Sequence, residues 1–171
     1  MEKSTRRQHD TEQEIDALVA RFDDLSLPKR EWTHFAHLTV GFCSLERFGV
    51  EASRLAMPDR IRRYNVASGT PNTDSGGYHD TITMFFLAAV ARFRALLPAG
   101  TSRLAAINLL IDDPLGAKDL PLMFYSRDRL MSVAARRRYV EPDLQPIERL
   151  DAIESAGGAL DRRASSPRTR I

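Results

Sequence analysis

The stretch Glu31–Phe48 reads EWTHFAHLTVGFCSLERF, and its pattern predicts one amphipathic helix. Its large apolar residues recur three or four positions apart, which is the spacing of a single helix face: Phe35, Leu38, Phe42 and Leu45. His34 and His37 lie three positions apart and share another face, which the small residues Gly41 and Ser44 continue. Small residues leave room beside a helix, so we expect this face to border a cavity and to form the wall of a polar site.

Helical periodicity also dominates the rest of the chain, and no series of alternating apolar and polar residues indicates strands. Turn residues separate further helical segments, some of them short, which we expect at residues 11–25, 50–67, 78–97, 101–111, 127–139 and 146–155. Pro58 is expected to begin a second helix within residues 50–67. The sequence thus predicts an all-α bundle of five or six helices, with irregular segments near residues 68–77 and 112–126.

The length of 171 residues is most simply that of one domain. We expect residues 11–155 to form this helical domain. Residues 1–10 are expected to be frayed, and residues 156–171 are expected to be disordered because they are rich in glycine, serine and arginine. Residues 121–126, PLMFYS, are left open between a short strand and an irregular segment.

Composition and charge narrow the class of protein. The chain is 43% hydrophobic and 28% charged, which is ordinary for a globular protein, and its net charge of +2 is too small to indicate nucleic-acid binding. The longest apolar run, Met84–Ala91, is too short for a membrane span. The first residues lack an apolar signal core, and the single Cys43 cannot form an internal disulfide. A cytoplasmic location is therefore expected.

Three short segments stand out by their polar and aromatic residues. They are WTHFAHL at residues 32–38, YHDTIT at residues 78–83 and YSRDRL at residues 125–130. Together they resemble an uncharacterised family of small bacterial helical proteins with WTHxAHL, YHxTxT and YSxxRL-like segments. The resemblance covers about residues 32–146 and implies no activity, but it favours an interpretation in which the three segments act as one unit.

The histidines of these segments suggest a metal site. His34 and His37 begin one expected helix and His79 begins another, and helix beginnings at the same end of a bundle can converge. Three neutral imidazoles can hold zinc or iron, and Glu31, three residues before His34, can add a carboxylate ligand. No second Glu-x-x-His pattern is present, so the sequence favours a mononuclear site over a dinuclear one.

Two other interpretations of the same histidines stay open. Without a metal, His34, His37 or His79 can act as a general base, because an unperturbed imidazole titrates near ~6.5. All three can also be purely structural, since a histidine at a helix start often only bonds to a neighbouring carbonyl. We exclude His9 from the site because it lies in the expected frayed segment.

Arg127 is the candidate for binding an anion. It follows Tyr125 at an expected helix start, and its planar guanidinium suits a carboxylate or phosphate. The alternative is a salt bridge from Arg127 to Glu141 or Asp143. The aromatic residues beside the candidate polar groups are expected to line the substrate pocket, namely Trp32, Tyr78 and Tyr125.

The sequence as a whole predicts a small cytoplasmic enzyme that acts on a small anionic substrate. Hydrolysis by a metal-bound water is the simplest chemistry for such a site, and oxygen chemistry on iron stays open. The alternative is a non-enzymatic ligand-binding or accessory protein that works with a partner. Assembly with a second copy or with another protein also stays open, whereas nucleic-acid and membrane binding are not expected.

Overall fold

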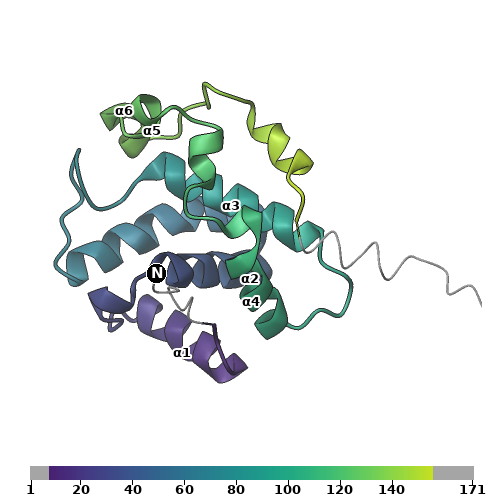
Figure 1. The fold of residues 1–171 in the computed structure, drawn as a ribbon. Helices are drawn as coiled ribbons and strands as arrows, with labels where there is room; N and C mark the ends of the chain where they lie inside the picture. Colours follow the sequence, from purple (N-terminus) through teal and green to yellow (C-terminus); the bar gives the residue numbers. More distant parts are fainter. Residues whose placement is uncertain (1–7, 156–171) are drawn as a thin grey trace, which may run out of the picture.

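The computed structural model describes residues 8–155 of the 171-residue chain, and the statements below concern this part. Residues 8–155 are all-α, as the sequence predicts, and no strand occurs among them. The same residues form six α-helices (Figure 1): α1 (Glu12–Asp23), α2 (His34–Ala67), α3 (Asp80–Ala95), α4 (Arg103–Asp112), α5 (Arg127–Leu130) and α6 (Val133–Arg137). Short 3-10 helices accompany them: η1 (Lys29–Glu31), η2 (Pro114–Gly116), η3 (Leu120–Met123) and η4 (Ile147–Ala152).

Each α-helix begins at a residue whose side chain caps it. In every case the side chain accepts a hydrogen bond from the backbone N–H three positions further on, and the capping residues are Thr11, Thr33, His79, Ser102, Ser126 and Ser132. Such caps satisfy one of the N–H groups that a helix start leaves without an intrahelical partner. The caps therefore fix the beginnings of the helices that carry the candidate site residues.

Helix α2 is divided at Gly49 into a first half (residues 34–48) and a second half (residues 50–67). Gly49 has φ +79° and ψ 176°, a conformation that favours glycine and ends the first half, as the sequence predicts. The second half lies beside the first, and Arg60 of the second half donates a 2.7 Å hydrogen bond to Ser44 of the first. The prediction of a new helix at Pro58 is wrong, since Pro58 lies inside the second half. Met57 and Ile61 are buried on either side of it, and this packing offsets the hydrogen bond that proline removes.

Helix α3 lies at the centre of the molecule and packs against both α2 and the C-terminal segments (Figure 1). Phe85 and Phe93 are fully buried on it, and the Phe85 ring contacts Phe124 at a centroid distance of 5.1 Å. One hydrophobic core joins the helices of residues 8–155. None of these helices has the length and apolar character needed to span a bilayer.

The C-terminal third is less regular than the rest. Residues 127–139 contain the two short helices α5 and α6, in agreement with the sequence, whereas residues 121–126 contain part of η3 and no strand. The expected terminal helix at residues 146–155 is the 3-10 helix η4. The predictions for residues 1–7 and 156–171 lie outside the described residues.

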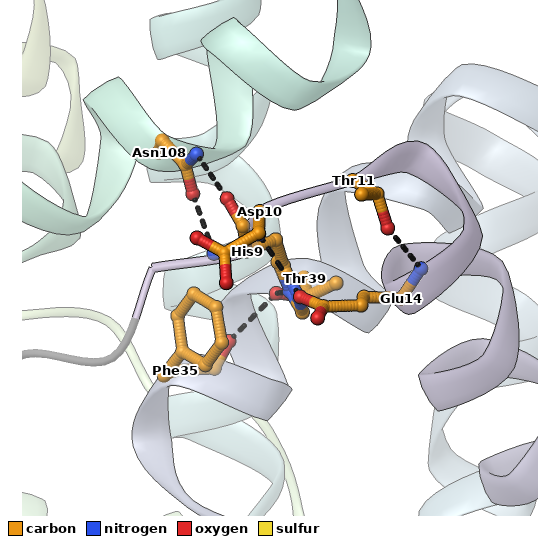
Figure 2. A network of polar contacts seen from close by, with 7 residues as sticks. All are labelled: His9, Asp10, Thr11, Glu14, Phe35, Thr39 and Asn108. Carbon is orange, nitrogen blue, oxygen red and sulfur yellow. Dashed lines mark hydrogen bonds and ion pairs between the residues drawn. The ribbon is translucent and has the colours of Figure 1, made fainter.

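His9 corrects the expectation of a frayed segment up to residue 10. Its side chain is only 7% exposed, and the Phe35 ring lies 4.4 Å from its own. Thr39 Oγ1 donates to the Phe35 carbonyl and therefore accepts a 3.1 Å hydrogen bond from His9 Nε2 (Figure 2). The Asn108 side chain bonds to the His9 backbone at both N–H and C=O. These partners are distant in the chain, so the local sequence pattern does not reveal them.

Candidate functional site

A cavity of about 840 Å³ lies between the two halves of α2, helix α3 and the segments that contain η1, η3 and α5. This volume is within the usual range of about 300–1,000 Å³ for pockets that bind small molecules. Most of the side chains that line it are apolar, and they come from all three long helical walls. The cavity therefore offers an apolar space at the place where the sequence predicts a site.

The residues that line this cavity fall into two groups. The charged lining residues Lys29, Lys118 and Arg127 are exposed to solvent, and we call the part of the lining that they form the mouth. Gly41, Val90 and other apolar lining residues are buried, and we call the part that they form the inner end. Both halves of α2 and helix α3 contribute lining residues.

All charged side chains that line the cavity are basic. They are Lys29, Lys118 and Arg127, and no aspartate or glutamate of residues 8–155 is among the lining residues. Their side chains make no hydrogen bond or ion pair within the described residues. They come from three different segments of the chain and together give the mouth a positive charge. An anionic group would be attracted to it from solvent.

Arg127 does not form the salt bridge that the sequence leaves open as an alternative. Asp143 instead accepts hydrogen bonds from the backbone N–H and hydroxyl of Ser126, at 2.8 and 2.6 Å. The carboxylate of Glu141 accepts a hydrogen bond from the Tyr139 hydroxyl at 3.4 Å, and its backbone carbonyl accepts from the Arg129 side chain at 2.6 Å. With these acceptors occupied by its neighbours, Arg127 is left at the mouth.

His37 is the histidine whose geometry best suits chemistry. Its Nδ1–H donates a 2.7 Å hydrogen bond to the Thr33 carbonyl, which makes Nε2 the unprotonated nitrogen of a neutral ring. Nε2 has no partner within the described residues, and the side chain is accessible from the cavity that it lines. The Trp32 ring lies against the imidazole at a centroid distance of 3.9 Å.

The surroundings of His37 favour its neutral form. The side chain of His37 is exposed, but the protein atoms around the ring desolvate it, and this desolvation lowers the pKa of His37 to about 4. The hydrogen bond to the Thr33 carbonyl acts in the opposite direction, while electrostatic interactions with His34 and Lys118 lower the pKa further. His37 therefore carries an available lone pair at neutral pH, which a general base requires.

His34 and His79 also line the cavity, but their rings are used to hold the fold together. His34 Nε2 donates to the Gly116 carbonyl at 2.8 Å. His79 Nδ1 accepts from the Ile82 backbone N–H at 3.4 Å, and its Nε2 donates to the Leu130 carbonyl at 2.9 Å. Both nitrogens of His79 are thus engaged. The three histidines line one cavity, and the geometry gives them different roles. Their convergence on a single site stays a prediction.

The side chains do not fit the metal site that the sequence predicts. Glu31 lies outside the cavity and pairs with Arg21 at 2.8 Å, beside a second cavity of about 590 Å³. A zinc or iron ligand needs a free lone pair, and His79 has none left for an ion. Among residues 8–155 no group of three or more histidine, cysteine, aspartate or glutamate side chains could hold a metal ion. We therefore derive no chemistry from a metal.

The three aromatic candidates lie in different places. Trp32 and Tyr78 line the cavity as predicted, although the Tyr78 hydroxyl is occupied by Asp80 at 2.6 Å. Tyr125 is fully buried away from the cavity and donates to the Val140 carbonyl at 3.0 Å. The prediction that Tyr125 lines the substrate pocket is therefore wrong. Its OH serves to hold the segment after α6 against the core.

Sequence reasoning missed two of the three basic residues at the mouth. Lys29 lies in η1 and Lys118 in the turn before η3, and neither belongs to a helical pattern or a motif. Lys29 is far from the other two in the chain, and Lys118 lies nine positions before Arg127 with no periodic pattern between them. The chain was also compared with known proteins. No protein-family model, no curated protein and no solved structure matches it.

Proposed function

We propose that this protein binds a small, largely apolar anion in the 840 Å³ cavity and that His37 acts on it as a general base. The observation that carries the proposal is the lining of the cavity, whose charged residues are all basic and whose remaining surface is mostly apolar. Arg127 provides a bidentate partner for an anionic group at the mouth. The neutral His37 lies among the same lining residues, with Nε2 available to a bound molecule.

A hydrolytic reaction is the simplest that this arrangement supports. His37 Nε2 accepts a proton from a water molecule as the water oxygen forms a bond to the acyl carbon of the substrate. The bond to the leaving group then breaks, and the imidazolium returns the proton to the departing oxygen. The Thr33 carbonyl holds the ring in the required tautomer and stabilises the imidazolium while the proton is on it.

Binding is tested by the fluorescence of Trp32, the single tryptophan of the chain, which lines the cavity. Titration with 1-octanesulfonate, an apolar anion, should change the Trp32 emission and saturate. Arg127→Gln should weaken the affinity at least tenfold, because loss of one partner of a charged hydrogen-bonded pair costs ~2–5 kcal/mol. Arg63→Gln is the matched control, since Arg63 is exposed on α2 and does not line the cavity. No saturable change in wild type, or equal affinity in both variants, would overturn the proposal.

The second candidate function is binding without turnover. It is favoured by the hydrogen bonds that engage both ring nitrogens of His79. Because of these bonds, His79 is not available as a second acid or base beside His37. Hydrolysis of the mono-4-nitrophenyl ester of octanedioic acid, which keeps a free carboxylate, separates the two candidates. An enzyme should show turnover above the rate in buffer that His37→Gln abolishes, with 1-octanesulfonate affinity retained. Equal rates for the two proteins would leave only the binding function.

A cytoplasmic location is part of the proposal. Cys43 is the single cysteine of the chain, and it is free and buried. Burial raises the pKa of its thiol to about 12, so Cys43 has the properties of a small apolar core residue. Such a thiol suits a reducing compartment, and fractionation of the source cells would test this location.

A further inference from the structure

We infer that the ligand is a linear aliphatic carboxylate, whose chain extends along the cavity to Gly41 and whose head group lies at the mouth. This inference rests on the proposed function and names the chemical class of the molecule bound. It makes Gly41 a residue that determines specificity for chain length. The observations that carry it are the space beside Gly41, the apolar lining of the inner end and the side-chain cations at the mouth.

Gly41 lies in the interior of a helix where the backbone does not require glycine. Its φ is not positive, and a Cβ built on it would meet only Leu87 Cδ2, at 3.9 Å, which is an ordinary contact. Glycine destabilises the interior of a helix relative to alanine, and here no close neighbour demands its small size. The space that Gly41 leaves belongs to the cavity, so a bound molecule accounts for this glycine where packing does not.

The inner end has the chemistry of a site for an aliphatic chain. Its walls are buried and apolar, and they include Val40, Gly41, Met57, Leu87 and Val90. Lining residues on α3 extend from Ile82 to Val90, which is about 12 Å along a helix, and those on α2 from His34 to Gly41, about 10 Å. A lining that continues over this length of two helices and becomes apolar at the inner end accommodates an extended aliphatic chain.

The charged groups of the mouth suit a carboxylate. They are side-chain cations on separate segments, namely Lys29, Lys118 and Arg127. Arg127 offers the planar fork that matches the two oxygens of a carboxylate. At each of the two nearby helix starts one backbone N–H is already bonded to a capping side chain, since Thr33 accepts from the Ala36 N–H and His79 from the Ile82 N–H.

The test is a chain-length series with the full-length protein. Butanoate, hexanoate, octanoate and decanoate are titrated at pH 7.5 against Trp32 fluorescence, with decanol and decyl phosphate as head-group controls. Wild-type affinity should rise about threefold to fourfold for each added methylene, the usual gain for burying this group in an apolar site. Gly41→Leu should remove this gain beyond hexanoate. Ala52→Leu, at an exposed position on the same helix, should retain it.

A second variant keeps the inference testable if Gly41→Leu does not fold. Gly41→Ala adds a methyl group that the structure accommodates, so it should raise the melting temperature and weaken decanoate binding in the same protein. Unchanged decanoate affinity in Gly41→Ala would contradict a chain at Gly41. Tighter binding of decyl phosphate than of decanoate, or equal binding of decanol, would contradict the carboxylate head.

The outcomes also separate this inference from the proposed function. If 1-octanesulfonate binds in an Arg127-dependent manner but affinity does not rise along the carboxylate series, the inference fails and the proposed function stands. If no anion of either kind changes Trp32 fluorescence, both fail. If the affinity rises with chain length and Gly41→Leu removes the rise, the inference is supported.

Discussion

The pKa of His37 couples the charge of a ligand to the protonation of the cavity. In the free protein the pKa is lowered to about 4, so the ring is neutral at pH 7. An anion bound near Lys118 and His37 would favour the imidazolium and raise this pKa in the complex. The complex then binds more protons than the free protein, so the affinity must rise as the pH falls from the pKa of the complex towards 4.

This linkage is measured with 1-octanesulfonate, because a sulfonate keeps its charge through the whole range. Affinity should increase severalfold between pH 7 and pH 5 in wild type. In His37→Gln the group that takes up the proton is absent, and the affinity should be nearly constant. A wild-type affinity that is flat or that decreases over the same interval would place the bound anion away from His37.

At the scale of elements, helix α3 depends on one histidine for its beginning. His79 accepts from the Ile82 N–H and donates to the Leu130 carbonyl, and thereby joins α3 to α5. We expect His79→Ala to lower the free energy of unfolding by ~1–2 kcal/mol, since it removes a cap and leaves a carbonyl without its donor. His79→Asn should recover part of the loss, because asparagine also caps helices well.

Urea unfolding of the three proteins measures these differences. A catalytic role would give another result, in which His79→Asn has wild-type stability and loses turnover completely. A structural role predicts that stability and ligand affinity change together in the alanine variant and recover together in the asparagine variant. Equal stability of wild type and His79→Ala would show that the cap contributes nothing.

The elements were largely predictable because their signals are local. Thr11 and Thr33 precede apolar periodic segments, and both cap helices in the structure. Gly49 interrupts such a segment and takes a conformation that favours glycine. Pro58 is a local signal that misleads, since burial on both sides of it outweighs the one lost hydrogen bond. The 3-10 segments are short and lack periodicity, so the sequence gives no reliable indication of them.

For the molecule as a whole, the site was predictable only where it follows from helix beginnings. His34, His37 and His79 lie at or near the starts of α2 and α3, and all three line one cavity. The roles of the same rings depend on carbonyls far away in the chain, such as Gly116 for His34. No local sequence pattern indicates which ring nitrogen such a partner will occupy. The sequence therefore predicts three histidine ligands for a metal, whereas in the structure the ring nitrogens of His79 are already bonded to protein groups.

The division of α2 has a consequence for the width of the cavity. Its two halves are opposite walls of the same space, and they are joined through the backbone of a single residue, Gly49. A Cβ at this position would meet no atom within 4 Å, so the surroundings do not hold the junction by packing against it. The separation of the two walls is set by the torsion angles of Gly49 at one end, by the Arg60–Ser44 hydrogen bond beyond it, and by the Tyr64 ring, which lies 5.0 Å from that of Trp32. A wider cavity would therefore require a rotation at Gly49 together with loss of the contacts that Arg60 and Tyr64 make.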